Sequence, residues 1–543
     1  MPASFLNRAR PVLDRLGLGR ALCLLACLAS SLSASSCSVV VNTKERASCD
    51  TSSECTARYG EPSACVNSAC TQLLSKECTE VWPANALSEE NVVLIGFMGA
   101  LQGSYASYGT PPKEGAELAL QEIELNANGL PAPTTSNSVR GQRHLAMLVC
   151  DHGSDPSRVA RHLVEDAHVP VIIGGSFSST TLQLFDDVAR PAGVLVLSPS
   201  ATSPALTLHD DDGLLWRTAP SDVVQAELLK FLVVDVQDAL HRTGVLADGQ
   251  SAKIAMPTKS DSAGLGLAAA AAGVDADSPS PAPAVRAGLP DQYPNPDDPE
   301  SGQINWRPFI DNIVNYSPHI ILAMGTGEFV TNMMQGIEEN WDTTQPRPWY
   351  LLPEGDRVTE LTDKVAQNPS YALNERVLGT APGARRSPLY NGFLTRFESA
   401  FNQREPGNLA EFGYDAAYLV AYAIAIANKS TPSGRELAEA MKHVSCQNMT
   451  KVPAGPGNFS GYFTTAANAG CINFDGASGP LDFNPDTGEA LSDIAMWCVR
   501  RNQNASYSFE PPLDSYYSVA ESAVIEGKPA LDLSKPGWCT PNP

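Results

Sequence analysis

The sequence predicts an α/β protein with two doubly wound lobes, each built on a parallel sheet, preceded by a small cysteine-rich segment. From residue 92 onward, apolar runs of strand length alternate with segments of helical periodicity. The alternation breaks near residues 217–220 and then starts again, and five cysteines gather between residues 49 and 78. Strands that alternate with helices form parallel sheets with helices on both faces. The length of 543 residues also favours two or three domains over one.

The N-terminus has the features of an export signal. An apolar run at residues 21–32 is followed by small residues up to Cys37, and basic residues precede it: Arg8, Arg10, Arg15 and Arg20. The run is shorter than the roughly 20 residues that span a bilayer. We therefore expect a cleaved signal peptide over residues 1–36 and no transmembrane helix in the mature chain.

Ala34-Ser35-Ser36-Cys37 resembles the lipobox of bacterial lipoproteins, although Ala34 stands where those usually have Leu. We expect lipidation at Cys37, which would anchor the protein to a membrane of the bacterial envelope. Cys27 is an alternative, and so is cleavage without a lipid, which would release a secreted protein. Choosing Cys27 leaves eleven further cysteines, an odd number, whereas choosing Cys37 leaves ten that can all pair.

The charge balance narrows the range of partners. The chain has 37 basic and 60 acidic residues, for a net charge of −23. Removing residues 1–36 takes away four Arg and one Asp, so the exported chain carries −23 − 3 = −26. A strongly negative chain repels nucleic acid and anionic lipid, so the sequence argues against both as partners.

Residues 37–90 form the cysteine-rich segment, which we expect to be a disulfide-stapled module or stiff tether. The spacing lacks the paired CxxC motifs and histidines of zinc sites, so we predict no metal. Cys150 can pair with Cys78. Four further cysteines can form two bridges, whose connectivity the sequence leaves open: Cys446, Cys471, Cys498 and Cys539.

The first lobe is predicted from three strand and helix units. The buried-strand run at 92–98 is followed by a helix face at i, i+3, i+4 and i+7: Ala116, Ala119, Leu120 and Ile123. Further strands are expected at 144–150, 169–173 and 193–198, with helices near 156–167 and 180–188.

The second lobe begins after the break at residues 217–220. We predict strands at 252–256, 319–324 and 348–352 with helices between them, one of which buries Phe309, Ile310, Ile313 and Val314. Residues 274–303 are rich in Pro, Asp and Ser and are expected to form a surface loop without a core.

Candidate ligand loops follow the strands, because ligands of open α/β sheets bind at the carboxyl ends of the strands. The loop after the strand 169–173 carries glycines and hydroxyls at residues 174–181 and leads into a helix, which favours an anion such as a carboxylate. The next loop, 198–204, contains two prolines, and Pro353-Glu354-Gly355 follows a strand of the second lobe. Each loop also fits an ordinary helix cap or turn.

The order of these short motifs carries a family resemblance. It rests on six matches: Gly96-Phe97-Met98 with Tyr108-Gly109, residues 150–156, Ile173-Gly174 with residues 178–181, residues 198–202, residues 353–355 and residues 479–483. From Val92 to about Val499 the chain resembles the leucine/isoleucine/valine-binding proteins of ABC transporters. These belong to the receptor ligand-binding region family and have the type I periplasmic binding fold.

The resemblance implies a role for five residues. Ser178 and Thr202 match positions that hold the α-carboxylate of the ligand. Ser200 matches a position whose backbone carbonyl accepts from the ammonium group, and Glu354 matches its acidic partner. Tyr108 matches an aromatic residue that lines the side-chain pocket.

The resemblance also shows departures. Ala263 and Thr326 stand where the second lobe of the family presents two tyrosines to the ligand. The identity of the ligand side chain therefore stays open, and leucine itself is not implied.

We therefore predict an extracytoplasmic solute-binding lipoprotein that captures an amino-acid-like molecule between two lobes and delivers it to an ABC transporter permease. An envelope sensor without a transport role and a scaffold with a decayed site are the alternatives. No GxSxG, HExxH or Walker motif suggests catalysis, and no cofactor is expected. We predict lobe 1 at 91–219 with 382–479 and lobe 2 at 220–381 with 480–543, joined by a three-stranded hinge near 219–220, 380–381 and 479–480.

Overall fold

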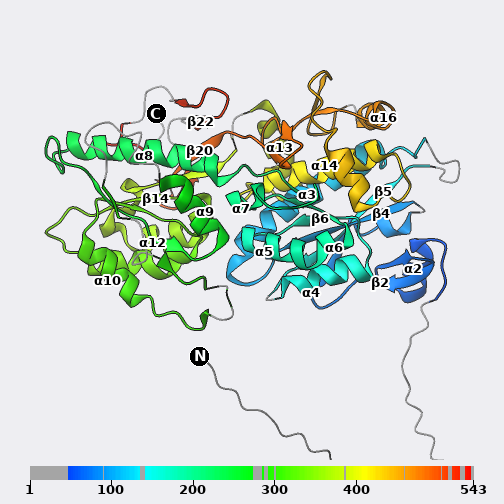
Figure 1. The fold of residues 1–543 in the computed structure, drawn as a ribbon, viewed down its shortest axis with the longest axis horizontal. Coiled ribbons are helices and arrows are strands. Elements are labelled where there is room, and N and C mark those ends of the chain that lie inside the picture. Colours follow the sequence, from blue (N-terminus) through cyan, green and yellow to red (C-terminus); the bar gives the residue numbers. More distant parts are fainter. Residues whose placement is uncertain are drawn as a thin grey trace, which may run out of the picture. The chain divides into compact units, whose positions relative to one another are not determined.

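The fold was determined as a computed structural model (Figure 1). One compact unit starts at Ala47. The structure describes residues 47–539 apart from residues 90, 135–140, 154, 273–283, 287–291, 297, 299–300, 384–386, 458, 503, 511–515 and 526–531. The predicted signal peptide and Cys37 lie outside the described residues. Within the described residues, no helix has the length and apolar character needed to cross a membrane.

The first part of the cysteine-rich segment is a small disulfide-linked module, as predicted. It contains α2 (Ser52–Tyr59) and the antiparallel hairpin of β1 (Ser63–Val66) and β2 (Ala69–Gln72). Disulfides Cys49–Cys65 and Cys55–Cys70 hold the module together. These cysteines form most of its small apolar core, which explains why so few large apolar residues suffice.

The first sheet has eight strands in the order β18-β19-β8-β7-β6-β4-β5-β3. Their bounds are β3 Cys78–Trp82, β4 Val92–Gly99, β5 His144–Asp151, β6 Val171–Gly174, β7 Leu195–Ser198, β8 Leu215–Arg217, β18 Phe483–Asn484 and β19 Glu489–Ala490. Strands β4 to β8 run parallel, as their nearly unbroken apolar runs predicted. We call this sheet and its covering helices lobe 1.

The edge strand β3 lies within the segment that was predicted to be a separate tether. It pairs antiparallel with β5, and the disulfide Cys78–Cys150 links the two strands. The pairing of Cys150 with Cys78 is thereby confirmed. The end of the cysteine-rich segment is therefore part of the lobe 1 sheet.

Helices cover both faces of this sheet (Figure 1). On one face lie α3 (Ala106–Ala127) and α14 (Ala410–Ala427), and on the other α4 (Pro156–Arg161), α5 (Ser178–Leu184) and α6 (Arg190–Ala192). Single-turn π segments at His162–Asp166 and Phe185–Ala189 continue α4 and α5. Lobe 1 also contains α7 (Pro204–Thr207), α13 (Pro388–Ala400), α15 (Gly434–Met441) and α16 (Phe459–Ala469). The predicted helix face at residues 116–123 is buried against the sheet.

The second sheet is nine-stranded, with the order β11-β9-β13-β14-β15-β20-β22-β23 and β21 paired to β20. Its strands are β9 Lys253–Ala255, β11 Ala284–Arg286, β13 Ile320–Leu322, β14 Trp349–Leu352, β15 Val377–Pro382, β20 Ile494–Arg501, β21 Tyr507–Glu510, β22 Tyr516–Ser518 and β23 Ala523–Ile525. The strands from β11 to β15 in this order are parallel, and β20 is antiparallel to β15. We call this sheet and its helices lobe 2.

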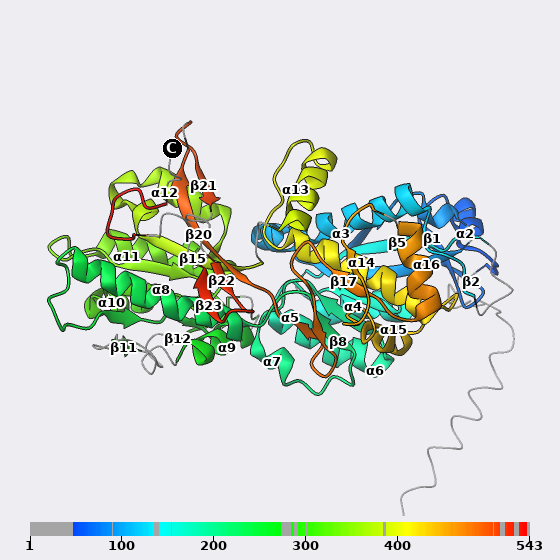
Figure 2. The same cartoon turned by 90° about the horizontal axis from the view of Figure 1, so that it is seen from above.

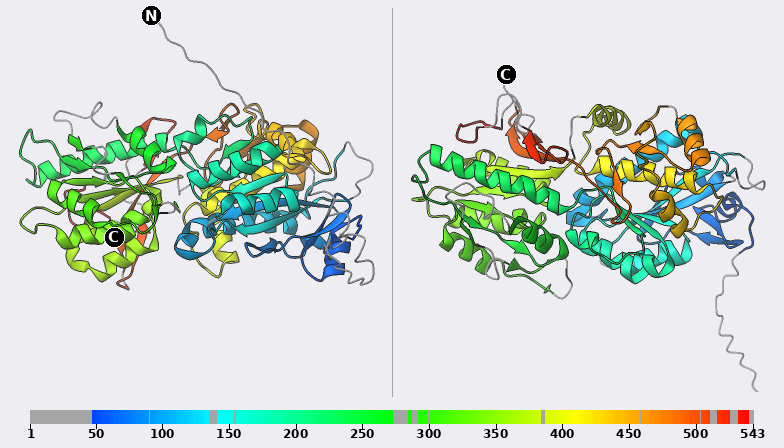
Figure 3. Two further views of the ribbon diagram at one scale, coloured as in Figure 1. Left: turned by 60° about the horizontal axis from the view of Figure 1, so that its bottom comes forward. Right: turned by 45° about the horizontal axis from the view of Figure 1, so that its top comes forward.

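Two hydrophobic clusters lie on opposite sides of this sheet. One contains α8 (Asp222–Arg242) and α9 (Ser262–Ala271), and the other contains α10 (Arg307–Tyr316), α11 (Gln335–Asn340) and α12 (Thr359–Gln367). Figure 3 shows the long helix α8, in green, along one face. The two predicted doubly wound lobes are thus present.

The Pro/Asp-rich segment is less detached than predicted. Within its described residues, β11 extends the edge of the second sheet, and β12 (Gln292–Tyr293) pairs with β10 (Thr258–Lys259). The Tyr293 side chain is fully buried against Trp306 and Phe309. Aromatic packing therefore ties this part of the segment to lobe 2.

The chain crosses between the lobes after Arg217, after Pro382 and before Ile494. Two of the crossings hydrogen-bond to each other, because the Gly383 amide donates to the Asp493 carbonyl at 2.8 Å. The prediction set the third crossing near residues 479–480. The chain there instead stays in lobe 1, where β18 and β19 extend the sheet beside β8.

The ten cysteines after Cys37 form five disulfides, as the even count predicted. The two whose partners were open are Cys446–Cys471 in lobe 1 and Cys498–Cys539 in lobe 2. Each lobe therefore has a bridge of its own near its C-terminal segment.

Candidate functional site

A glycine turn and two serines shape the first ligand loop of lobe 1. Gly175 has φ of 83°, a conformation that favours glycine, and its carbonyl accepts from Ser198 Oγ at 3.3 Å and Ser200 Oγ at 3.0 Å. Ser178 begins α5, is buried, and accepts from the Ser203 amide at 3.1 Å. The two loops predicted to hold a carboxylate are thus joined to each other.

Arg217 holds the second ligand loop, residues 198–204, in place through hydrogen bonds to its backbone. Its guanidinium donates to the carbonyls of Ala201 at 3.2 Å and Ser203 at 2.9 Å. It also donates to Thr207 and forms an ion pair with Glu489. Arg217 is 1% exposed, so these contacts are shielded from water and hold the backbone around Thr202 in one position.

Glu354 comes from lobe 2, in the short helix Glu354–Asp356 that follows β14. The buried amide of Gln225 donates to its carboxylate and to the Thr380 side chain at 3.0 Å. Burial raises the pKa of Glu354, while the Gln225 amide and the Thr202 hydroxyl oppose the rise. Because Thr202 belongs to lobe 1, the predicted carboxylate-binding and ammonium-binding residues meet across the lobe boundary.

Asp222 adds a second carboxyl group here. It begins α8, is 2% exposed, and its amide donates to the Thr202 carbonyl at 2.8 Å. Desolvation raises the pKa of Asp222 well above its usual range, and the charge of Glu354 raises it further. The Thr202 hydroxyl and the Arg217 charge act in the opposite direction.

Tyr108 lies near the start of α3 and packs in an aromatic cluster. Its ring is 5.4 Å from that of Phe177, and the Tyr105 ring lies 5.2 Å from the same Phe177 ring. Burial raises the pKa of the Tyr108 hydroxyl well above its usual range, followed by the charge of Asp356 and of other lobe 2 carboxylates. Tyr108 therefore faces acidic groups of lobe 2.

Lys259 is a second buried cation at this junction, besides Arg217. Its Nζ lies 3.1 Å from Thr326 Oγ1, 3.2 Å from Asp261 Oδ2 and 3.9 Å from Glu328 Oε2. The ammonium group also lies 5.8 Å from the centre of the Phe177 ring. Thr326, which replaces a tyrosine of the resembled family, thus belongs to a polar network.

The lobes touch in this structure. Ser203 Oγ donates to the Ser262 carbonyl at 2.6 Å, and Arg357 donates to Asn408 at 3.2 Å on another part of the boundary. Figure 2 shows α5 and α7 of lobe 1 beside α9 of lobe 2. Residues of both lobes are therefore in contact next to the predicted site residues.

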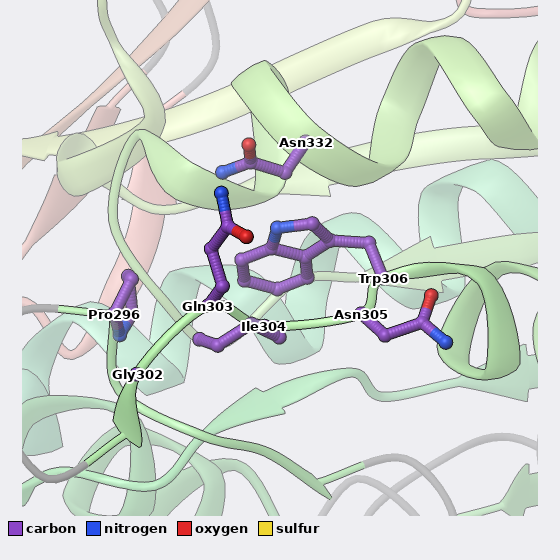
Figure 4. Close-up of a pocket in the computed structure, with 7 residues that line it drawn as sticks. All are labelled: Pro296, Gly302, Gln303, Ile304, Asn305, Trp306 and Asn332. Carbon is purple, nitrogen blue, oxygen red and sulfur yellow. The ribbon is translucent and has the colours of Figure 1, made fainter.

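A separate open cavity of about 500 Å³ lies in lobe 2 (Figure 4). Its lining includes the Trp306 indole and the amides of Gln303, Asn305 and Asn332, and none of the predicted site residues. The ring of Trp306 packs 5.7 Å from that of Tyr293. The cavity is thus distinct from the lobe junction.

The structure brings together the five predicted residues and adds others that sequence reasoning missed: Asp222, Gln225, Lys259, Glu328 and Asp356. A signal existed for Asp356, which is two residues after Glu354 in the same loop. Asp222 likewise follows the first crossing directly. The other three stand in segments without a recognisable motif.

Comparisons with known proteins agree with this architecture. The sequence profile of the family described as periplasmic binding protein matches residues 92–500, about three quarters of the chain. The chain belongs to the periplasmic binding protein family. A Leu/Ile/Val-binding protein of Citrobacter freundii is 34% identical over 162 residues, which are 29% of this chain and 40% of that protein. The leucine-, isoleucine-, valine-, threonine-, and alanine-binding protein of Pseudomonas aeruginosa is 29% identical over 27% of this chain and 37% of its own.

Solved structures show the same fold. A leucine-binding protein from Thermotoga maritima has a TM-score of 0.55 at 17% identity, covering 80% of this chain and 98% of its own. A solute-binding protein from Rhodopseudomonas palustris in complex with 3,4-dihydroxybenzoic acid has a TM-score of 0.53 at 16% identity, covering 78% and 98%. These relatives are described as binding proteins for amino acids or other solutes. Because members of one fold hold different ligands, the ligand must be argued from the site itself.

Proposed function

We propose that this periplasmic binding protein captures an amino-acid-like small molecule between its two lobes and delivers it to the permease of an ABC transporter. The observation that carries the proposal is the meeting of Thr202 of lobe 1 with Glu354 of lobe 2, beside Ser178. Hydroxyls opposite a carboxylate, covered by two hinged lobes, suit a small zwitterion.

In the proposed mechanism, lobe 1 binds first. The hydroxyls of Ser178 and Thr202 donate to the ligand carboxylate, and the Ser200 carbonyl accepts from its ammonium group. Closure then brings Glu354 to the same ammonium group and Tyr108 to the side chain. Expelling water lowers the local dielectric constant and strengthens the ion pair.

The location follows from the N-terminal features. We propose that Cys37 is lipidated after removal of residues 1–36, so that the protein is held at the bacterial envelope outside the cytoplasm. The hinge at the three crossings would let lobe 2 move relative to lobe 1. The closed form would then be recognised by the permease.

The test is a thermal-shift screen of the chain without its signal peptide against amino acids and small carboxylates, since a ligand bound only by the native state raises the melting temperature. We expect one amino-acid class to raise Tm, and the shift to disappear in Glu354→Ala and in Ser178→Ala. Glu339→Ala, an exposed carboxylate on α11, is the matched control and should keep the full shift. No shift across the panel, or equal loss in the control, would rule out the amino-acid assignment.

A further inference from the structure

We infer that the ligand of this site carries two cationic nitrogen groups joined by a short aliphatic chain, as in a basic amino acid or a diamine. This inference rests on the proposed function and narrows it to one ligand class.

The lobe junction has an excess of carboxyl groups over cationic side chains. Five carboxyl groups gather there: Asp222, Asp261, Glu328, Glu354 and Asp356. Asp356 is fully buried, and the exposed fractions of Asp222 and Glu328 are 2%. The cations beside them are Lys259 and Arg217, and the latter is already paired with Glu489. Burying an unpaired charge is costly, so without a cationic partner burial favours the neutral form of these acids, and a cation beside them would favour the carboxylate form.

Lys259 satisfies only part of this excess. It lies between Asp261 and Glu328, and Glu328 also accepts from the Tyr293 hydroxyl at 2.8 Å and the Thr326 amide at 2.9 Å. This network is complete within the protein. Among the residues that the structure describes, no ion pair joins a cation to three of these carboxyl groups, although Arg217 acts electrostatically on the first and Lys259 on the last: Asp222, Glu354 and Asp356.

Unpaired acceptors point to the missing partner. Asp222 Oδ2, both carboxylate oxygens of Asp356 and the amide oxygen of Gln225 are buried and receive no hydrogen bond of good geometry, although the Val330 amide lies close enough to Asp356 to lower its pKa. Gln225 is 1% exposed and is not an acid, so its orphaned oxygen is independent of the charge count. A buried acceptor without a donor is destabilising, because it has lost its hydrogen bonds to water without replacement. N–H donors of a ligand would satisfy these atoms.

Donors without an acceptor are few at the same junction. Among the described residues there, Arg217 Nε lacks an acceptor, and the hydroxyls of Tyr108 and Ser262, which can donate or accept, lack partners of good geometry. The ligand that completes this set must therefore present more donors than acceptors. A cationic amine does so, whereas an aliphatic side chain such as that of leucine does not.

The acceptors fall at two positions, which calls for two nitrogen groups. Asp222 and Gln225 lie beside Glu354, where the proposed mechanism places the first ammonium group. Asp356 stands two residues beyond Glu354 and acts electrostatically on Tyr108, the residue proposed to line the side-chain pocket. A second cation at the end of the ligand side chain would pair with Asp356 and lie near the aromatic ring.

A divalent metal ion does not fit these acids. Among the described residues, no three of these carboxyl groups bring ligand oxygens within 4.8 Å of one another. Calcium requires six to eight oxygens at short range. Separate single carboxylates suit separate ammonium groups instead.

Protonation supplies a second readout. Burial raises the pKa of Asp356 well above its usual range, and the charges of Glu328 and Glu354 raise it further, while Lys259 and the Val330 amide lower it. A cationic ligand beside Asp356 would stabilise the carboxylate form and lower this pKa. Binding near neutral pH should therefore release protons, and the heat of binding should vary with the ionisation heat of the buffer.

The experiment is isothermal titration of the exported chain with four probes: L-lysine, L-norleucine, L-leucine and 1,5-diaminopentane. Norleucine is lysine without its side-chain amine, so the pair isolates the second cation. We expect lysine to bind at least about tenfold more tightly than norleucine, equivalent to about 1.4 kcal/mol. Asp356→Asn should remove this difference, whereas Asp363→Asn, an exposed control on α12, should keep it.

The outcomes separate this inference from the proposed function. If leucine or norleucine binds as tightly as lysine, and Glu354→Ala abolishes that binding, the proposed function stands and the inference of two cations is overturned. If no probe binds, both are overturned. Loss of lysine binding but not of diaminopentane binding in Ser178→Ala would identify an amino acid as the ligand source, and equal binding in that variant would identify a diamine.

Discussion

Replacing Arg217 tests whether the ligand loop of lobe 1 is held in place by a buried guanidinium. In Arg217→Met, the carbonyls of Ala201 and Ser203 lose their donors, at about 1–3 kcal/mol each. The partly buried Glu489 also loses its cation, and breaking a buried ion pair costs about 3–5 kcal/mol, a term that overlaps with the first. We expect a loss of about 4–6 kcal/mol in the free energy of unfolding of lobe 1.

Urea unfolding followed by tryptophan fluorescence measures this loss, because Trp216 is buried next to Arg217. The matched control is Arg190→Met, which removes exposed ion pairs with Asp210 and Asp212 and should change the free energy of unfolding far less, because water screens these pairs. Ligand affinity should fall in Arg217→Met and not in the control. Equal destabilisation of the two variants would refute the reasoning that Arg217 organises the loop.

Three further outcomes are expected. The double variant Cys78→Ser, Cys150→Ser removes a disulfide that joins residues 72 positions apart. We expect it to lower the free energy of unfolding by about 4 kcal/mol, measured by urea unfolding under non-reducing conditions. The raised pKa of Asp356 stabilises the ligand-free protein below the unfolded pKa of about 4, and this contribution is lost as pH rises through the folded pKa. Asp356→Asn should therefore flatten the decline of Tm between pH 4 and 8, and an unchanged slope would contradict this. Gly175→Ala should abolish ligand binding, because the added Cβ would clash with the hydroxyl oxygen of Thr181 in α5. The control is Gly213→Ala, which is also at positive φ but has open space around it and should retain binding.

Most of the fold could be predicted because strands buried on both faces have nearly unbroken apolar runs. The strands at 92–98, 144–150 and 348–352 were found to within one residue, as β4, β5 and β14. The short strands β18 and β19 could not be found, since they have two residues each and are defined by pairing beside β8. Edge strand β3 was missed for a related reason, because its cysteine suggested a tether rather than a partner for β5.

The candidate site was predictable where it follows from position in the sheet. Loops after parallel strands converge at one edge, which led to Ser178, Thr202 and Glu354. The burial of Lys259 and Glu328 could not be predicted, because it depends on how distant segments pack around these side chains. That information is contained in contacts between distant segments and not in any local pattern.

The disulfide and the strand pairing between β3 and β5 have a mechanical consequence for the proposed N-terminal anchor. The strand that leads out of the cysteine-rich module is bonded into lobe 1 by both backbone hydrogen bonds and a covalent bridge. In the proposed mechanism, an anchor upstream of β3 would therefore pull on lobe 1 and not on lobe 2. Lobe 2 would then be free to close over the ligand without working against the anchor.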